Sequence, residues 1–485
     1  MASAAVIRDL VSLLGEGGVL HASPDTEKYE RGYRYGFGRA RAVARPATIA
    51  ELRSIVRYAH ASELRIIAQG ANTGLVGAST PDSSGGELLV SLDRLHGIEA
   101  IDAHNRTACA LAGTRLSALN AAAARHELFF PIDLGSDPTL GGMVATNTGG
   151  SRLLRCGDVQ RNLLGLEAIL ADADATVLTD LQGLRKDNSG VDLKQLFVGT
   201  GGSFGIICRV QVELHRLPRQ AAAALVTPVS HAAVPELLTL LETQAGEFLG
   251  AFEGMSANAM KAALEHNRRL RNPFSAGELP PYAVLVELLS TVGRDQLDLP
   301  ELLALLLSRA MEAREPLVKD ACVGRGEDFW ALRHSISDGV RAAGTVIAFD
   351  ISVPRSRLPA CRAELVACLT EQYPQLRICD FGHCGDGGDH FNIVWPASAG
   401  ACDPSVTEAV RELIYDRAVR GYGGSFSAEH GVGPHNIHYY RRYTNPAERA
   451  MAGGLKRLCD PKGLLGRVDF SEPAGIAATT SRRAG

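Results

Sequence analysis

The chain has 485 residues, of which 46% are hydrophobic and 21% charged, and its formal net charge is −4. A chain of this length is expected to form two or three domains. The nearly balanced charge excludes the basic surface typical of proteins that bind nucleic acid or anionic membranes. The sequence contains no run of about 18 apolar residues, and its first residues lack the pattern of a signal peptide. We therefore expect a cytoplasmic protein with no membrane span and no nucleic-acid partner.

The first 216 residues are predicted to form an α+β domain with many glycines. Thr48 and Glu51 form the pattern of a capping box, which predicts a helix over residues 49–59. A second helix is predicted over residues 114–125. Apolar runs predict strands at residues 42–46, 64–68, 88–92, 165–170, 176–178 and 206–214.

A domain boundary is expected near Leu217 and Pro218, where longer helices begin to alternate with strands. Helices over residues 234–245 and 256–266 and a strand over 282–288 suit a ferredoxin-like α+β sheet. We expect a first domain over 1–216 and a second over 217–425. A C-terminal segment over 426–473 and a flexible tail over 474–485 complete the chain.

Ten cysteines are scattered along the chain, and none forms a C-x-x-C pair. This pattern argues against iron–sulfur clusters and zinc ribbons. Free thiols in a reducing compartment fit it best.

Three glycine-rich segments lie in the first domain, at residues 69–77, 131–150 and 199–206. Glycines allow backbone N–H groups to converge on an anion, and Asn72 and Thr73 add polar side chains. A pyrophosphate fits the first loop, although a tight turn without a ligand would also explain that loop alone. None of the segments has the G-x-G-x-x-G or P-loop pattern in its required setting, which disfavours a nicotinamide-binding Rossmann domain and a P-loop NTPase.

Two clusters near the C-terminal end carry the residues of a metal site. Strands predicted over 376–381 and 391–395 would form a hairpin that places His383 and His390 opposite each other. Glu429 suits the third ligand of a divalent ion, and the neighbouring His430 suits a general base. Such a ligand set suits zinc, and also manganese or iron. Cys384, between the two histidines, is interpreted as a small loop residue and not as a ligand.

A predicted helix around residue 333 carries two candidate substrate-binding side chains. Arg333 and Ser337 are four residues apart, so helical spacing places them on one face. A solvated helix face is the alternative explanation of this pair.

Together these segments resemble the vanillyl-alcohol oxidase superfamily of flavoproteins. Within it the chain is similar to the D-2-hydroxy-acid dehydrogenase group, which includes D-lactate dehydrogenase, the glycolate oxidase flavoprotein subunit and D-2-hydroxyglutarate dehydrogenase. The resemblance rests on residues 69–77, 131–150, 186–190, 197–206, 383–390, 427–433 and 460–463. It implies a two-subdomain FAD-binding domain of the PCMH type, a ferredoxin-like α+β cap, and a C-terminal helical segment that returns to the flavin.

The resemblance also implies non-covalent FAD, because the first loop contains no histidine that could be linked to the flavin. Ile206 is expected near the adenine end. The full set of residues expected to contact the cofactor is Gln69, Gly70, Ala71, Asn72, Thr73, Gly74, Leu75, Pro131, Gly135, Ser136, Gly142, Thr146, Gly149 and Ile206.

The implied reaction is oxidation of a D-2-hydroxy acid to the 2-oxo acid. His383, His390 and Glu429 would hold the metal that activates the hydroxyl, His430 would take its proton, and hydride would pass to flavin N5. Arg333, as a catalytic and substrate-binding residue, would hold the carboxylate with Ser337 and Asn392. The electron acceptor stays open between a quinone, an electron-transfer flavoprotein, a cytochrome and oxygen, and a homodimer is also left open.

Three positions depart from the resembled group. Ala348 stands where a lysine is usual, which weakens the case for a second carboxylate on the substrate and favours a monocarboxylate such as D-lactate. Gly201 stands where a glutamate is usual, and Gly466 where an asparagine–proline pair is common. The alternatives are a metal-free flavin alcohol oxidase and a non-catalytic flavin-binding protein. A metal hydrolase would leave the glycine loops unexplained.

Overall fold

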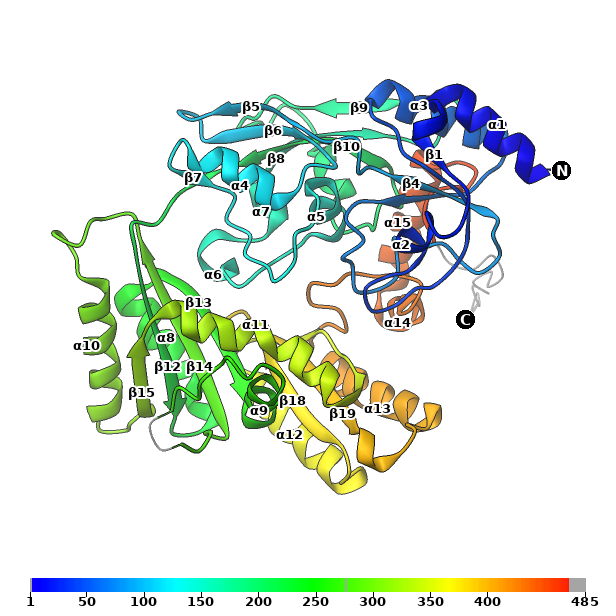
Figure 1. Cartoon of the computed structure of the whole chain (residues 1–485). Coiled ribbons are helices and arrows are strands. Elements are labelled where there is room, and N and C mark those ends of the chain that lie inside the picture. Colours follow the sequence, from blue (N-terminus) through cyan, green and yellow to red (C-terminus); the bar gives the residue numbers. More distant parts are fainter. Residues whose placement is uncertain (1, 275–276, 471–485) are drawn as a thin grey trace, which may run out of the picture.

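The computed structural model describes residues 2–274 and 277–470. Figure 1 shows an upper part made from the N-terminal residues and a lower part made from the middle of the chain. The last helices, α14 (Ile437–Tyr443) and α15 (Pro446–Cys459), return to the upper part. The predicted tail over 474–485 lies outside the described residues.

The first sheet of the upper part is mainly parallel. Its order is β1-β2-β4-β3, and only β1 (Val19–Leu20) is antiparallel to its neighbour. Helix α3 (Ile49–Ala61) connects β2 (Ala40–Ala44) to β3 (Ile66–Gln69), while β4 (Glu87–Ser91) lies between them. The hydroxyl of Thr48 accepts a hydrogen bond from the backbone N–H of Glu51, which confirms the predicted helix cap. Helices α1 (Ala2–Leu14) and α2 (Glu27–Glu30) complete this part.

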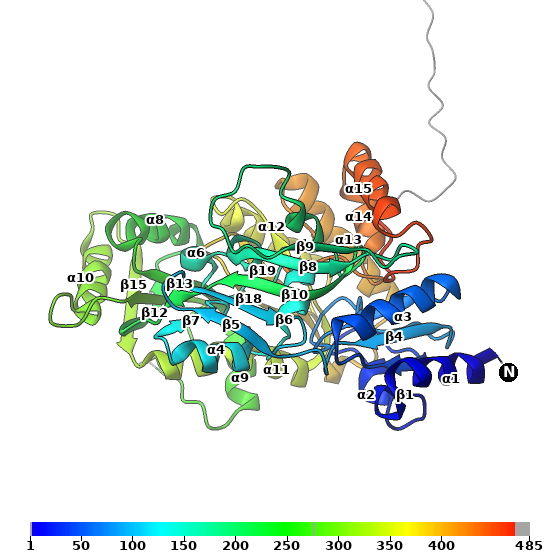
Figure 2. The ribbon, with the colours of Figure 1, turned by 90° about the horizontal axis from the view of Figure 1, so that it is seen from above.

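The second sheet of the upper part is antiparallel, in the order β5-β6-β10-β8-β9. Figure 2 shows these strands side by side. Their bounds are Ile98–Asp102 for β5, Thr107–Leu111 for β6, Ile206–Glu213 for β10, Leu163–Ile169 for β8 and Val177–Asp180 for β9. Helices α4 (Leu116–Ala124) and α5 (Leu140–Thr146) and the short α6 (Leu153–Cys156) and α7 (Val159–Asn162) accompany it, with the small pair β7 (Leu128–Phe129) and β11 (His215–Arg216).

The lower part is built on one large antiparallel sheet, in the order β15-β12-β14-β13-β18-β19-β16 with β17 paired to β19. Its strands are β12 (Gln220–Pro228), β13 (Leu249–Ser256), β14 (Tyr282–Ser290), β15 (Val318–Gly324), β16 (Gly344–Ile347), β17 (Ile351–Ser352), β18 (Arg377–Gly382) and β19 (Gly388–Pro396). The ferredoxin-like order of two helices and four strands therefore accounts for only part of this sheet. The mixed helix-and-sheet class itself is confirmed.

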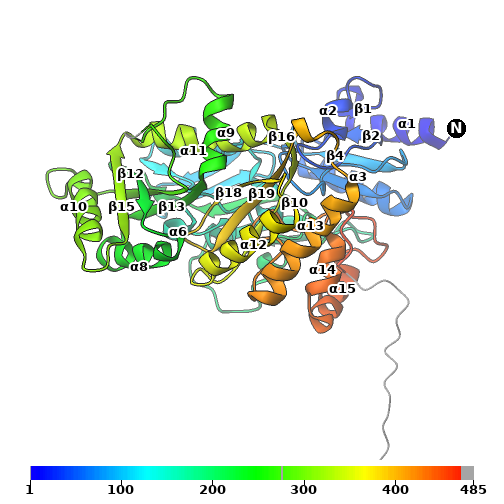
Figure 3. The same ribbon diagram turned by 90° about the horizontal axis from the view of Figure 1, so that it is seen from below.

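Helices cover both faces of the large sheet because side chains alternate along its strands. Ala223 and Leu225 of β12 pack toward α9 (Ala257–His266) and α11 (Gly326–Ala342). Ala224 and Val226 face the opposite way. There they meet α8 (Val234–Ala245), α10 (Leu299–Glu312) and α12 (Leu358–Gln372). Figure 3 shows α9 and α11 on one side of the strands and α8 and α12 on the other.

The C-terminal segment joins the upper part after α13 (Pro404–Asp416). The backbone N–H of Ile66 donates to Leu464 at 2.7 Å, and that of Gly466 donates back to Ile66 at 2.8 Å. Lys456 is buried and donates to the carbonyl of Ser203. The chain between α13 and α14 therefore passes from the lower part to the upper part, and it carries Glu429 and His430.

All ten cysteines are free thiols in the described structure. None of the described helices has the length and apolar character needed to cross a membrane.

Candidate active site

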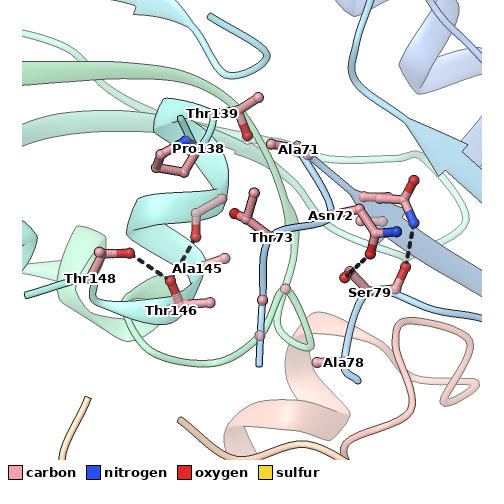
Figure 4. A pocket seen from close by; sticks show the side chains of 18 of the residues that line it. Ala71, Asn72, Thr73, Ala78, Ser79, Pro138, Thr139, Ala145, Thr146 and Thr148 are labelled. Carbon is pink, nitrogen blue, oxygen red and sulfur yellow. Dashed lines mark hydrogen bonds between the residues drawn. The ribbon is translucent and has the colours of Figure 1, made fainter. Parts of the chain in front are cut away.

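A cavity lies in the upper part between the end of β3, helix α5 and the start of β10 (Figure 4). All three glycine-rich segments contribute to its wall, so the structure brings together the loops that the sequence singled out. Its lining is mostly apolar or backbone, with a few hydroxyl groups from Thr73, Ser79, Ser136, Thr139, Thr146 and Thr148. This is the character expected of a cofactor site.

Hydrogen bonds from side chains in the cavity wall fix the conformation of the first glycine-rich loop. The Gln69 amide donates to the carbonyls of Tyr29 at 2.8 Å and Ser79 at 2.7 Å. Asn72 has φ 57 and accepts a hydrogen bond from the Ser79 hydroxyl (Figure 4). A Cβ at Gly70 would lie only 2.1 Å from the hydroxyl oxygen of Thr139. The loop therefore needs glycine at this position for two backbone segments to approach.

Thr139 presents a polar atom that the protein leaves unsatisfied. Its buried Oγ1 has no hydrogen-bond partner among the described residues, although it lies at the cavity wall. Buried hydroxyls without partners are uncommon in folded proteins. A bound group with polar atoms would supply the missing partner, which fits a dinucleotide such as FAD.

Twelve of the fourteen residues expected to contact the cofactor line this cavity. Gly135 lines the adjoining cavity described below instead. Pro131 is buried and lines neither cavity, because this segment reaches the walls of the two cavities only from Asp133 onward. Contact of Pro131 with the cofactor stays a prediction.

Gly201 and Gly202 also line the cavity. From the sequence, Gly201 was noted only as a departure from the resembled group. The φ angles of the two glycines are +60° and +77°. A glutamate at Gly201 would adopt this left-handed conformation only with strain. Gly466 likewise has φ +68°, so both departures coincide with backbone that favours glycine.

A second cavity adjoins the first and is lined by both parts of the molecule. The two cavities share a wall that includes Glu429 and His430. From the lower part, α11, β18 and β19 contribute Arg333, Ser337, Phe381, His383, His390 and Asn392. Every residue predicted for metal, base or substrate thus lines one cavity.

The two motif histidines approach one carboxylate. His390 pairs in register with Phe381, and His383 lies in the turn that follows Gly382. Their ring centroids are 5.3 Å apart. Nε2 of His383 lies 3.6 Å from Glu429 Oε2, and Nε2 of His390 lies 3.3 Å from Glu429 Oε1. Two imidazoles that face one carboxylate are residue types that a divalent metal takes as ligands.

Glu253, in β13, connects the metal and substrate sides of the site. Its Oε1 lies 2.7 Å from Nδ1 of His383, and its Oε2 accepts from Nε and Nη2 of Arg333. Burial alone would raise the pKa of Glu253, but His383 and Arg333 lower it to about 2. A carboxylate bound to Nδ1 leaves Nε2 of the histidine free for a metal. Sequence reasoning missed Glu253, whose only signal is a charge inside an otherwise apolar strand.

Asp350 is a second carboxylate that the sequence reasoning missed. Its Oδ2 accepts the backbone N–H groups of Glu429 and His430 at 3.0 and 2.8 Å, and lies 3.4 Å from Nδ1 of His430. Asp350, His390, Glu429 and His430 offer ligand atoms within 4.8 Å of one another. The geometry therefore also allows His430 to approach a metal, since its Nε2 is 3.4 Å from Glu429 Oε1.

Electrostatics distinguish the histidines of the cluster. Burial lowers the pKa of His390 well below its usual value, so its ring is neutral and able to donate an electron pair. Burial also opposes the charged form of His430, but Asp350 and Glu429 outweigh it and raise the pKa. His430 is therefore the better proton acceptor of these two rings.

Two models of known protein families match separate stretches of the chain. Residues 40–179 match the FAD binding domain family, and residues 217–468 match the family of FAD linked oxidases, C-terminal domain. The second match covers more than half of the chain. The chain belongs to the FAD-linked oxidases. FAD binding is thereby supported, and the expected superfamily is confirmed.

Relatives of this FAD-linked oxidase include D-2-hydroxyglutarate dehydrogenases. The mitochondrial enzyme of Arabidopsis thaliana is 30% identical over 93% of this chain and 79% of its own length. The mitochondrial enzyme of Bos taurus is 33% identical over 88% of this chain and 76% of its own length. The enzyme of Xanthomonas citri pv. viticola is 30% identical over 87% of this chain and 88% of its own length. These relatives confirm the prediction of a flavin-dependent oxidoreductase that acts on CH–OH groups.

Solved structures confirm the fold. Alkyldihydroxyacetonephosphate synthase matches with a TM-score of 0.70 at 16% identity, over 95% of this chain and 84% of that one. p-Cresol methylhydroxylase with substrate bound matches with a TM-score of 0.72 at 14% identity, over 96% of each chain.

Proposed function

We propose that this FAD-linked oxidase oxidises a D-2-hydroxy acid to the 2-oxo acid, with His430 as the base. The observation that supports this most is the shared wall of the two cavities, where Glu429 and His430 lie between the FAD cavity and the substrate side chains. The relatives named for D-2-hydroxyglutarate support the same substrate class.

Arg333 and Ser337 bind the substrate carboxylate in this proposal. Two nitrogens of Arg333 are held by Glu253, and its Nη1 has no hydrogen bond among the described residues. The guanidinium also lies 4.8 Å from the centroid of the Phe381 ring. Arg333 is thus fixed in direction while one edge remains available for a carboxylate oxygen. Asn392 lines the same cavity and is the third substrate contact.

The ligands of the proposed metal are His383, His390 and Glu429. A divalent ion there, proposed as zinc with manganese or iron as alternatives, would lower the pKa of a bound hydroxyl. His430 accepts the hydroxyl proton at Nε2, while Asp350 holds its Nδ1 side. When bound, FAD accepts the hydride that leaves Cα. One proton and one hydride leave the substrate, which accounts for the 2-oxo product.

Taken alone, Ala348 favours a monocarboxylate substrate such as D-lactate, whereas the relatives are named for a dicarboxylate substrate. A metal-free flavin alcohol oxidase is the second candidate, because the observed cluster offers a base and an acid without an ion. The division into domains at 216 and 425, the cytoplasmic location, the homodimer, the non-covalent attachment of FAD and the electron acceptor stay predictions.

Anaerobic bleaching of the flavin with matched D- and L-2-hydroxy acids tests the proposal. We expect D-acids to bleach the wild-type protein. His430→Asn should keep FAD and metal but bleach about a thousandfold more slowly, whereas His390→Asn should lose the metal. Bleaching by L-acids alone would contradict the stereochemistry. Loss of metal from His430→Asn would make His430 a ligand, and full activity without metal would favour the alcohol oxidase.

A further inference from the structure

Beyond Asn392 the substrate cavity opens into a recess between α11, β16 and residues 33–35. Ser337 and Asn392 line both spaces, so the recess is continuous with the substrate side of the site. Ala348 lines it with only a methyl group. The recess is lined by Tyr33, Arg34, Tyr35, Ser337, Val340, Arg341, Gly344, Val346, Ala348 and Asn392.

Arg341 reaches this recess from the same helix that carries the proximal substrate residues. Arg333, Ser337 and Arg341 follow one another at four-residue intervals on α11, and all three line the substrate cavity. Eight residues of helix span about 12 Å, and long helical side chains lean toward the helix N-terminus. Arg341 therefore lies in the cavity wall together with Ser337, with which it also shares the recess.

Contacts with the upper part hold the Arg341 side chain in place. Its Nη2 donates to the hydroxyl of Tyr33 at 2.8 Å, and its guanidinium lies 4.9 Å from the centroid of that ring. Asp338 is its only ion-pair partner within the described residues, at 3.8 Å on an exposed helix surface. Such a pair neutralises little charge in contact with water.

Arg34 adds a second cation from the opposite wall. No carboxylate of the described chain forms an ion pair with it within 4.0 Å, although it lines both the recess and the substrate cavity. Desolvation lowers the pKa of Arg34 and repulsion from Arg341 adds to this effect, while Tyr35 and the Asp350 carboxylate oppose it. A third guanidinium, that of Arg411, binds the hydroxyl of the neighbouring Tyr35 at 3.2 Å. The recess therefore concentrates positive charge that an anion would relieve.

We propose that Arg34 and Arg341 form a subsite for a second anionic group, a carboxylate at the far end of the 2-hydroxy acid. This inference rests on the proposed function and names the substrate class, a 2-hydroxy dicarboxylate. It replaces the monocarboxylate substrate expected from Ala348, because the cations come from α11 and from the segment around residue 34 and not from position 348. Guanidinium groups suit this role because they bind carboxylates with fixed geometry.

The test compares glutarate with pentanoate, which have five carbons each and differ in one carboxylate. Neither has a hydroxyl to oxidise, so binding to the FAD-loaded protein is measured from the perturbation of the flavin absorbance spectrum. We expect the wild-type protein to bind glutarate at least tenfold more tightly. Arg34→Gln and Arg341→Gln should each weaken glutarate binding about tenfold and change pentanoate binding less than twofold.

Arg377→Gln, at the exposed start of β18, removes the same charge away from both cavities and should change neither affinity. Equal binding of the two acids to the wild-type protein would overturn the subsite, even if both variants failed to fold. An equal loss for both acids in the variants would also overturn it. Bleaching with D-2-hydroxyglutarate and D-2-hydroxypentanoate is measured in parallel. If neither bleaches the flavin while the arginines still select glutarate, the proposed function fails and the subsite stands.

Discussion

Glu253 Oε1 lies 2.7 Å from Nδ1 of His383, although 130 residues separate the two in the sequence. The carboxylate is 1% exposed, and its other oxygen binds Arg333. One buried group therefore fixes the direction of a proposed metal ligand and of the proposed substrate arginine. Such partners of a ligating histidine set its tautomer and its basicity.

Replacement of Glu253 by glutamine should weaken metal binding 10- to 100-fold, because His383 loses the carboxylate that orients it. The volume of the side chain is nearly unchanged, but the Arg333 charge loses its buried partner, so the melting temperature should also fall. Metal retention against a chelator measures the first effect. Glu242→Gln, which removes a carboxylate paired with the partly exposed Arg355, is the control. Unchanged metal retention in Glu253→Gln would contradict the orienting role.

Thr139→Val should weaken FAD binding about tenfold, or about 1.4 kcal/mol, because it removes a hydroxyl that has no protein partner. The apoprotein should keep its melting temperature, since no internal hydrogen bond is lost. Titration of the apoprotein with FAD, followed by flavin fluorescence, measures the affinity. Thr139→Ser keeps the hydroxyl and should bind FAD as the wild-type protein does. A valine variant with undiminished affinity would show that the hydroxyl does not contact the cofactor.

Lys456→Met should lower the free energy of unfolding by about 3 kcal/mol, because it leaves Asp460 as a buried charge without its cation. The lysine also donates to the carbonyls of Ser203 and Leu465, so the C-terminal segment should loosen from the FAD domain. Chemical denaturation gives the free energy. The matched control is Lys462→Met, whose exposed pair with Glu63 should contribute less than about 1 kcal/mol. Equal effects of the two substitutions would argue against a structural role of the buried pair.

His231 should make the protein less stable in mild acid. Burial lowers the pKa of His231 to about 4, against about 6.5 in the unfolded chain. Between these values the unfolded state binds more protons, so stability is fully present above pH 6.5 and is lost as the pH falls toward 4. The loss approaches about 3 kcal/mol at most. Melting temperatures of wild-type protein and His231→Phe across this range test it: the wild-type curve should fall relative to that of the variant as the pH drops from 6.5 toward 4, and parallel curves would contradict it.

The sequence predicted those structural elements that depend on residues close together in the chain. Thr48 and Glu51 mark the start of α3 because a helix cap depends on residues three apart. The glycines between His383 and His390 predicted the hairpin because a tight turn fixes the pairing of its flanking strands. The glycine-rich loops of the FAD cavity were recognisable for the same reason, since open loop backbone requires these residue types.

The tertiary structure alone decided which distant side chains complete the site. Glu253 is a single carboxylate in an apolar strand and Asp350 lies between β16 and β17, and no spacing relates them to His383 or His430. Arg34 and Arg341 are more than 300 residues apart, yet they line one recess because the N-terminal segment lies against α11. Charges act through space and not along the chain. The sequence therefore determined the cofactor loops, the histidine hairpin and the class of chemistry, while the packing of the two parts determined what orients those groups and where positive charge collects.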